Sequence, residues 1–156
     1  MEMIRHILVP TDGSASALAA AAMAGLLARN CKSRVTIIVA HSDAAIALPG
    51  LTEAALPGST PFNPFPKKAA RKHFEAAANE HVVPAVKTAL GTVPGGVGVA
   101  QVWGHTAEEI CNYAAANAVD LIVMGKRGGG KFKRLLLGSV SSHVVAHAPC
   151  AVTLVA

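Results

Sequence analysis

Short apolar runs rich in branched residues alternate with longer alanine- and leucine-rich segments along the chain. Apolar runs of about four to eight residues that end in turn-forming residues are typical of buried strands. Segments with apolar positions every three or four residues are typical of helices. On this basis we predict strands at residues 4–9, 34–41, 97–103, 120–124 and 150–155.

Helices are expected in most of the intervals between these strands. Ser14 should cap the first helix, and Thr106 with Glu109 forms a capping box at the start of the third. Pro84 should kink the second helix or end its first part. Residues 42–66 hold five prolines and are expected to be irregular. The predicted helices span residues 14–30, 67–90, 106–117 and 139–147.

Strands that alternate with helices predict a parallel sheet with helices on both faces. We therefore expect an α/β protein, built as a single doubly wound domain over residues 1–156 with a variable loop at about residues 42–66. The strand at 120–124 is strongly apolar and should be central, whereas the more mixed strand at 97–103 should lie nearer an edge. Ligands of such sheets bind at the carboxyl ends of the strands, where the winding reverses.

Composition narrows the class of protein. A chain of 156 residues is the size of one domain, and its 52% hydrophobic and 15% charged residues exclude a disordered chain. The longest uncharged apolar stretch is 12 residues, at 17–28, too short for a membrane span of about 20. Cys31, Cys111 and Cys150 form no CxxC motif, and the start does not have the pattern of a signal peptide. We expect a cytoplasmic protein with reduced, buried thiols and no membrane contact.

A glycine-rich basic segment with the pattern G-x2-G-x9-G-S follows the fourth predicted strand. Glycines let backbone N–H groups approach an anion, and the start of a helix attracts negative charge. The hydroxyls of Ser139 and Ser141 add donors at that start, so the motif predicts a phosphate site. A glycine-rich surface hairpin beside an N-capping serine is the alternative. The fixed positions are Gly125, Gly128, Gly138 and Ser139, and Lys126, Arg127 and Lys131 carry positive charge.

Asp12 is a second candidate, at the carboxyl edge of the first strand. Its carboxylate can accept hydrogen bonds from a ribose hydroxyl or a base amine, or help to position a metal held by phosphates. Alternatively, it is an acid that is favourable near a helix N-terminus.

Together with the opening ILVPTDGS and the ending HAPCAVTLV, the glycine motif resembles the universal stress protein family, and specifically its ATP-binding subgroup. The resemblance covers residues 4–155 and is weakest at residues 44–72. It implies a five-stranded sheet of order 3-2-1-4-5, usually a homodimer, and ATP or a related adenine nucleotide between the ends of strands one and four. Mg²⁺ held through the phosphates is compatible with this arrangement.

The resemblance also implies individual site residues. Pro10, Thr11 and Asp12 would border the base and ribose, Ala40 would contact the adenine through its backbone, and Met124 and Gly125 would contact the nucleoside. Arg127, Gly128, Gly138, Ser139, Val140 and Ser141 would surround the phosphates. The last strand, residues 150–155, resembles the edge that pairs in dimers of the family. An open apolar edge strand also favours such pairing on physical grounds.

The favoured function is a nucleotide-binding module in which ATP acts as a signal or a stabiliser in a stress response. A binder of AMP or cyclic AMP, a slow ATPase or nucleotidyl transferase, and a nucleotide-free interaction protein are the alternatives. Transfer chemistry usually needs a base and further metal-binding carboxylates. Asp12 is the one carboxylate that the sequence places near the phosphates, so no catalytic residue is predicted.

Three histidines and one aromatic residue are further candidates for a site. His143 and His147 share a helix face, but no third ligand is in phase, so no metal site is predicted. His105 follows the third strand and is interpreted as a loop residue; the alternative is that it approaches the site from this neighbouring strand. Phe132 stands alone among basic neighbours and is a poor stacking platform, so nucleic acid is not an expected partner.

Overall fold

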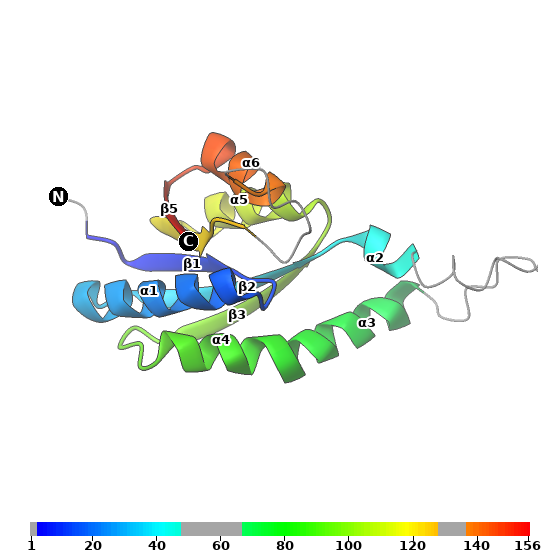
Figure 1. Cartoon of the computed structure of the whole chain (residues 1–156), viewed down its shortest axis with the longest axis horizontal. Coiled ribbons are helices and arrows are strands. Elements are labelled where there is room, and N and C mark those ends of the chain that lie inside the picture. Colours follow the sequence, from blue (N-terminus) through cyan, green and yellow to red (C-terminus); the bar gives the residue numbers. More distant parts are fainter. Residues whose placement is uncertain (1–2, 48–66, 128–136) are drawn as a thin grey trace, which may run out of the picture.

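The computed structural model describes residues 3–47, 67–127 and 137–156. This part of the chain forms a five-stranded parallel sheet in the order β3-β2-β1-β4-β5 (Figure 1). The predicted α/β class, strand order, central fourth strand and edge position of the third strand are confirmed. The strands are β1 (His6–Pro10), β2 (Arg34–His41), β3 (Val97–Trp103), β4 (Leu121–Gly125) and β5 (Ala151–Val155).

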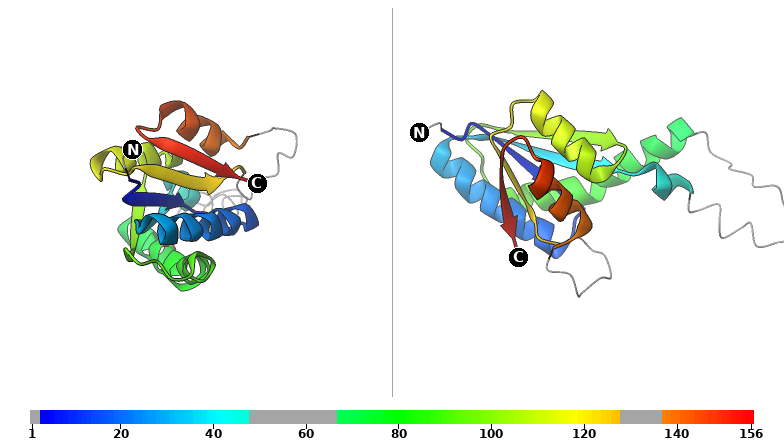
Figure 2. Two further views of the ribbon diagram at one scale, coloured as in Figure 1. Left: turned by 90° about the vertical axis from the view of Figure 1, so that its left-hand side faces the viewer. Right: turned by 90° about the horizontal axis from the view of Figure 1, so that it is seen from above.

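Helices cover both faces of the sheet. Figures 1 and 2 show α1 and α4 on one face, α5 and α6 on the other, and α2 with α3 extending beyond the sheet. The helices are α1 (Ala15–Cys31), α2 (Asp43–Ala47), α3 (Lys67–Ala77), α4 (Val83–Leu90), α5 (Thr106–Ala116) and α6 (Ser139–His147).

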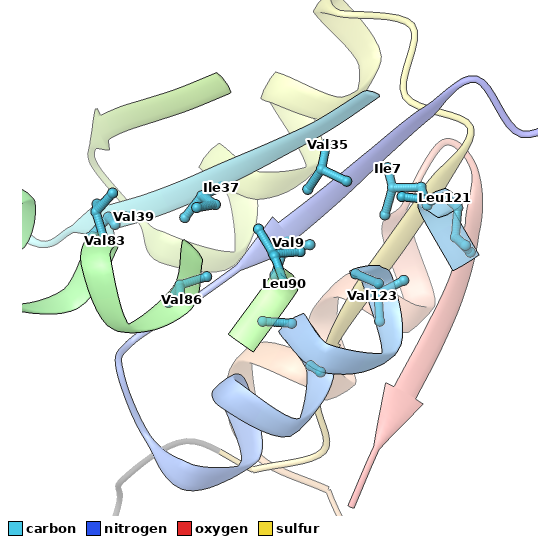
Figure 3. Close-up of a cluster of buried hydrophobic side chains, with 14 of the residues drawn as sticks. Ile7, Val9, Val35, Ile37, Val39, Val83, Val86, Leu90, Leu121 and Val123 are labelled. Atoms are coloured by element: carbon cyan, nitrogen blue, oxygen red, sulfur yellow. The ribbon is translucent and has the colours of Figure 1, made fainter. Parts of the chain in front are cut away.

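The core lies in two layers because side chains of a strand alternate between faces. Ile7 and Val9 of β1 pack with α1 and α4 (Figure 3), whereas Leu8 packs towards α5 and α6. The small residues of α1 allow a close helix contact: a Cβ on Gly25 would lie 2.0 Å from the carbonyl oxygen of Leu90 at the end of α4. The alanine-rich composition therefore serves tight packing of α1 against the sheet and α4.

Two predicted helix starts have different outcomes. The Ser14 cap is confirmed, because its Oγ accepts a hydrogen bond from the Ala17 N–H at 3.3 Å. The capping box at Thr106 and Glu109 is wrong: the N-cap is His105, without a side-chain cap, and Thr106 is the first helical residue. Glu109 instead lies over Gly104, where an added Cβ would be 3.0 Å from its Oε1.

The helix predicted at residues 67–90 is divided in three. A π-helical segment, Ala78–Val82, separates α3 from α4, and Pro84 lies in the first turn of α4. A proline ring would clash with the carbonyl four residues earlier in a regular helix, and the wider turn relieves this clash. Residues 42–66 were expected to be irregular, but α2 occupies the start of this region. Residues 48–66 lie outside the described residues.

The described part of the chain contains no helix long and apolar enough to span a membrane. Cys31, Cys111 and Cys150 are free thiols and are half-buried rather than fully buried. Burial raises the pKa of the Cys111 and Cys150 thiols. Both side chains therefore remain protonated at neutral pH.

A polar network closes the amino ends of β1 and β2. The His6 ring is 3% exposed, and its Nε2 lies 2.8 Å from Thr36 Oγ1. Its Nδ1 lies 3.0 Å from Arg34 Nη2 and 3.1 Å from the Asn117 carbonyl oxygen. Either neutral tautomer finds partners, because the Thr36 hydroxyl can donate or accept. Burial lowers the pKa of His6, and the neighbouring Arg34 cation acts in the same direction.

Asp120 completes this amino-end network. Its Oδ2 accepts hydrogen bonds from the backbone N–H groups of Arg5 at 2.8 Å and His6 at 2.9 Å. These hydrogen bonds hold the pKa of Asp120 below its ordinary value. The carboxylate thereby ties the start of β4 to the start of β1.

Candidate functional site

A cavity of about 370 Å³ opens at the carboxyl ends of β1, β2 and β4, beside the first turns of α1, α5 and α6. The winding of the sheet reverses between β1 and β4, which is where such folds bind ligands. Gly128 and Lys131 lie outside the described residues, and Lys126 is not among the lining residues. The other predicted site residues line the cavity: Pro10, Thr11, Asp12, Ala40, Met124, Gly125, Arg127, Gly138, Ser139, Val140 and Ser141.

Part of the cavity wall is apolar. Ala40 and Ile38 come from the same face of β2, Met124 comes from β4, and Ile110 comes from α5. Ile38, Ile110 and Met124 belong to the core layer beneath α5 and α6, so this wall continues the hydrophobic core. A flat apolar group such as a purine ring would be sheltered from water here.

Several lining residues were not predicted from the sequence. Ile38 stands two positions before Ala40, and Ile110 stands four positions after Thr106, so strand and helix periodicity place each pair on one face. That periodicity could have found them once the orientation of β2 and α5 was known. The additional lining residues are Ser14, Ala17, Ile38, Thr106, Ile110 and Leu137.

Backbone turns at the end of β1 position Asp12. Its Oδ1 accepts a hydrogen bond from the Ser14 N–H at 3.0 Å, and Thr11 Oγ1 accepts one from the Gly13 N–H at 3.2 Å. Gly13 has a φ of 78°, a conformation that glycine adopts without a steric cost. The carboxylate is therefore held in a short turn that lines the cavity, directly before α1.

The first turn of α6 supplies N–H donors to the cavity. Its N-cap, Gly138, has no side chain, and the first N–H groups of a helix lack partners inside that helix. Ser141 differs from its predicted role as a hydroxyl donor to a ligand. Its side chain is 2% exposed, and its Oγ lies 2.8 Å from the Lys126 carbonyl oxygen. The Gly138 N–H donates to the same carbonyl, which ties α6 to the end of β4.

Both described glycines of the motif line the cavity, but the space around the two positions differs. A Cβ on Gly125 would lie 2.6 Å from Ser16 Oγ and 3.0 Å from the Ser16 carbonyl carbon, so it would displace the Ser16 side chain and crowd the backbone of α1. Ser16 Oγ also donates to the Arg127 carbonyl oxygen. A Cβ on Gly138 would make ordinary contacts at 3.5 Å or more. Gly125 is required by packing, whereas Gly138 leaves space over the helix start.

The charged groups at the cavity suit an anion better than a metal held by protein alone. Arg127 and the donor end of α6 favour negative charge, and Asp12 is the acid among the described lining residues. No group of three histidine, cysteine or acidic side chains in the described residues could hold a metal ion. The His143 and His147 rings are stacked at 4.1 Å, and His147 Nδ1 lies 2.9 Å from the His143 carbonyl oxygen.

The fold and this cavity define a doubly wound α/β domain with a cavity at its switch point. The family model described as "Universal stress protein family" matches residues 3–156, and the chain belongs to this family. A universal stress protein of Thermus aquaticus is 35% identical over 98% of this chain and 99% of its own length.

Solved structures agree with this assignment. Universal stress protein UspA from Lactobacillus plantarum is 26% identical, with a TM-score of 0.72 and full coverage of both chains. A universal stress protein solved in complex with cAMP is 23% identical, with a TM-score of 0.65 over 99% of this chain and 98% of that one. At this identity the second structure supports the fold alone.

Proposed function

We propose that this chain binds an adenine nucleotide, with ATP as the first candidate, in the cavity at the switch point. The observation that carries the proposal is the division of that cavity. The same cavity is lined by an apolar wall from β2, β4 and α5, by a helix start that offers N–H groups, and by Arg127. A purine ring suits the first surface, and phosphates suit the second.

In this proposal the nucleoside and the phosphates occupy opposite ends of the cavity. Pro10, Thr11, Asp12, Ala40, Met124 and Gly125 border the base and ribose; Arg127, Gly128, Gly138, Ser139 and Val140 surround the phosphates. Ser141 positions the start of α6 through Lys126 and offers its backbone N–H. Mg²⁺ bound to the phosphates would neutralise part of their charge, with Asp12 as the available carboxylate.

The nucleotide acts as a signal or a stabiliser in a stress response. A ligand that binds the folded state alone stabilises it by RT ln(1 + [L]/Kd), about 2.7 kcal/mol at a hundredfold excess over Kd. The proposal includes a cytoplasmic homodimer paired through β5. This strand forms an outer edge of the sheet among the described residues, and its last four residues are half-buried. An open edge of this kind favours pairing with a second copy.

AMP or cyclic AMP is the alternative ligand, and slow ATP hydrolysis is the alternative activity. The structure of a family member with cAMP makes cyclic AMP a natural competitor in any assay. Hydrolysis would need a base beside the phosphates, and Asp12 is the carboxylate that lines the described cavity. We therefore assign no catalytic residue.

The first experiment denatures freshly purified protein and identifies any released small molecule by chromatography and mass spectrometry. Release of ATP supports the proposal, whereas release of AMP or cyclic AMP changes the nucleotide and keeps the site. A thermal shift on adding millimolar ATP and magnesium is measured in parallel. No released nucleotide together with no thermal shift would exclude an ATP-binding function.

The Gly138→Val variant is the matched test of the site. A Cβ at this position makes ordinary contacts, so the unliganded variant should unfold within about 1 kcal/mol of the parent. Its branched side chain fills the space over the start of α6, and we expect at least a hundredfold loss of nucleotide affinity by calorimetry. Parent-like affinity in the folded variant would place the phosphates elsewhere.

A further inference from the structure

Helix α3 is attached to the sheet at the carboxyl ends of β2 and β3. It extends beyond the sheet beside α2 (Figure 1), and no residue of α3, all of which the structure describes, is fully buried. Its aromatic contacts go to His41 and Trp103, which end β2 and β3 and are paired in the sheet. The position of α3 therefore depends on these two strand ends.

Stacked rings form the centre of this attachment. The His41 and Trp103 rings are stacked with centroids 4.6 Å apart, and the Phe74 ring of α3 meets them edge-on, at 6.4 Å and 6.1 Å. The Arg71 guanidinium lies 5.0 Å from the centroid of the Trp103 ring, within the range of a cation–π interaction. Trp103 Nε1 also donates a hydrogen bond to Glu75 Oε1 at 2.7 Å. Trp103 therefore carries much of the attachment.

Hydrogen bonds extend the attachment from His41. His41 Nε2 lies 2.6 Å from Gln101 Oε1. Gln101 Nε2 donates to the Glu75 carbonyl oxygen at 3.0 Å and to Asn79 Oδ1 at 2.9 Å. Because the backbone carbonyl of Glu75 can only accept, the Gln101 amide nitrogen faces it and the amide oxygen accepts from His41 Nε2. These contacts fix the orientation of the ring at the end of β2.

A carboxylate at the start of α2 completes the attachment. Asp43 Oδ1 and Oδ2 accept hydrogen bonds from Arg71 Nη2 at 2.8 Å and 3.0 Å. The Arg71 and Asp43 side chains are 36% and 42% exposed, so this ion pair contributes little to overall stability. It does constrain the path of the chain after β2, because Asp43 stands two positions after His41. The α3 clamp is defined as the following side chains: His41, Asp43, Arg71, Glu75, Gln101 and Trp103.

The α3 clamp holds the same strand end that forms a wall of the proposed nucleotide cavity. Ala40 lines that cavity, and successive side chains of a strand point to opposite faces, so His41 holds this strand end from the other face. The connection from β3 to α5 is tied to the same point. The Gly104 N–H donates to the His41 carbonyl oxygen at 3.0 Å, and Thr106 then lines the cavity. A base bound against the end of β2 therefore meets a wall whose position the clamp sets.

We propose that the α3 clamp holds the end of β2 in the position that the nucleoside requires, with Arg71 and Trp103 as positioning residues, so that nucleotide binding and docking of α3 stabilise each other. This proposal rests on the proposed nucleotide site. Arg71 and Trp103 are not among the described residues that line the cavity, so they act through the ends of β2 and β3. Coupling between two sites is reciprocal, and it typically changes affinity by about fivefold or more.

The test compares Arg71→Gln with Lys72→Gln by calorimetry. Both variants remove one positive charge from α3, but Lys72 is exposed and is not part of the clamp. Each protein is titrated with ATP and with adenosine, which carries no phosphate. We expect Arg71→Gln to lose about fivefold in affinity for both ligands, and Lys72→Gln to lose less than about twofold for either. A loss for ATP alone, or equal losses in the two variants, would indicate a charge effect on the phosphates and overturn the clamp.

Two measurements on the parent separate positioning from a merely structural role. Trp103 is the one tryptophan of the chain, so tryptophan fluorescence reports on the clamp. Its emission should change on addition of ATP and saturate at the Kd that calorimetry gives. The backbone amides of α3 should exchange with deuterium about fivefold more slowly at saturating ATP, because the coupling is reciprocal. Unchanged emission and unchanged exchange in a protein that binds ATP would contradict the coupling.

The remaining outcomes distinguish failure of the clamp from failure of the nucleotide site. A parent that binds neither ATP nor adenosine would end both proposals. If Arg71→Gln unfolds more easily but binds both ligands as the parent does, the nucleotide site stands and the clamp is only structural. Trp103→Phe is a milder second variant, because it keeps an aromatic ring and removes the N–H donor to Glu75. It should weaken binding of both ligands in the same direction, and parent-like affinity would exclude Trp103 as a positioning residue.

Discussion

The two ends of the same sheet use polar groups in opposite ways. At the amino ends of β1, β2 and β4, the His6 ring and the Asp120 carboxylate are satisfied by the protein itself. At the carboxyl ends, α5 and α6 begin without side-chain caps, and a cavity takes the place of a closed network. The polar groups of the first end stabilise the fold, whereas the second end leaves helix N–H donors beside a cavity, as the proposed function requires.

The cause of this difference is the parallel arrangement of the strands. Each crossover helix in such a sheet begins near the carboxyl end of the preceding strand. Helix starts, with their N–H groups, therefore collect at one end of the sheet. The chain caps α1 with Ser14 but leaves α5 and α6 uncapped around the cavity, so the donors that remain belong to the site.

Removal of the Asp120 carboxylate should have the largest effect on stability. Asp120→Ala leaves the Arg5 and His6 N–H groups without their acceptor, and we expect the free energy of unfolding to fall by about 3 kcal/mol. Chemical denaturation measures this loss. Asp43→Ala is the control, since Asp43 pairs with exposed Lys67 and Arg71 and such pairs contribute about 0–1 kcal/mol. Equal losses in the two variants would show that Asp120 contributes no more to stability than an exposed ion pair does.

Alanine at the two cavity glycines should have different effects. Gly125→Ala forces its Cβ against the Ser16 backbone, and we expect a loss of about 2 kcal/mol, because overpacking that displaces backbone costs about 1–3 kcal/mol. Gly138→Ala should change the free energy of unfolding by less than about 0.5 kcal/mol and should lower nucleotide affinity. Thermal melts and calorimetry on both variants test this. If Gly138→Ala destabilised the protein more than Gly125→Ala, then Gly138 and not Gly125 would be the glycine that packing requires.

Acidification should weaken the amino-end network. Burial lowers the pKa of His6 in the folded protein, whereas the unfolded chain titrates near the usual value of about 6.5. Between the folded pKa and about 6.5 the unfolded state binds more protons, so stability falls as the pH falls through this window. Denaturant midpoints between about pH 7.5 and pH 5.5 measure the slope.

The matched variant for this pH effect is His6→Gln. It removes the titrating ring and keeps a polar side chain beside Thr36 and Arg34. We expect a less stable protein whose stability changes less with pH over the same range. The hydrogen bonds that lower the pKa of Asp120 contribute at more acidic pH, outside this window. An unchanged slope in His6→Gln would show that other groups cause the pH dependence.

Local patterns were sufficient for the strands, most helices and many, but not all, of the described residues that line the cavity. Apolar runs identify these strands because helices cover both faces of the sheet, so side chains on both sides of a strand are apolar. The glycine motif and Asp12 identify the site because they follow strands that end at one edge. The bounds were less accurate: β1 extends to Pro10 rather than ending at Val9, and α3, a π-helical segment and α4 replace one continuous helix.

The sequence by itself determined the alternation of strands and helices, and with it the edge of the sheet on which a ligand site forms. Tertiary structure decided which side chains face that site. Thr106 lines the cavity instead of capping α5, and Ser141 holds Lys126. It also brought His6 to Asn117 and Asp120, and His105 to His143. Periodicity and capping rules describe neighbours along the chain, whereas these contacts join residues that only the packing of the sheet and helices brings together.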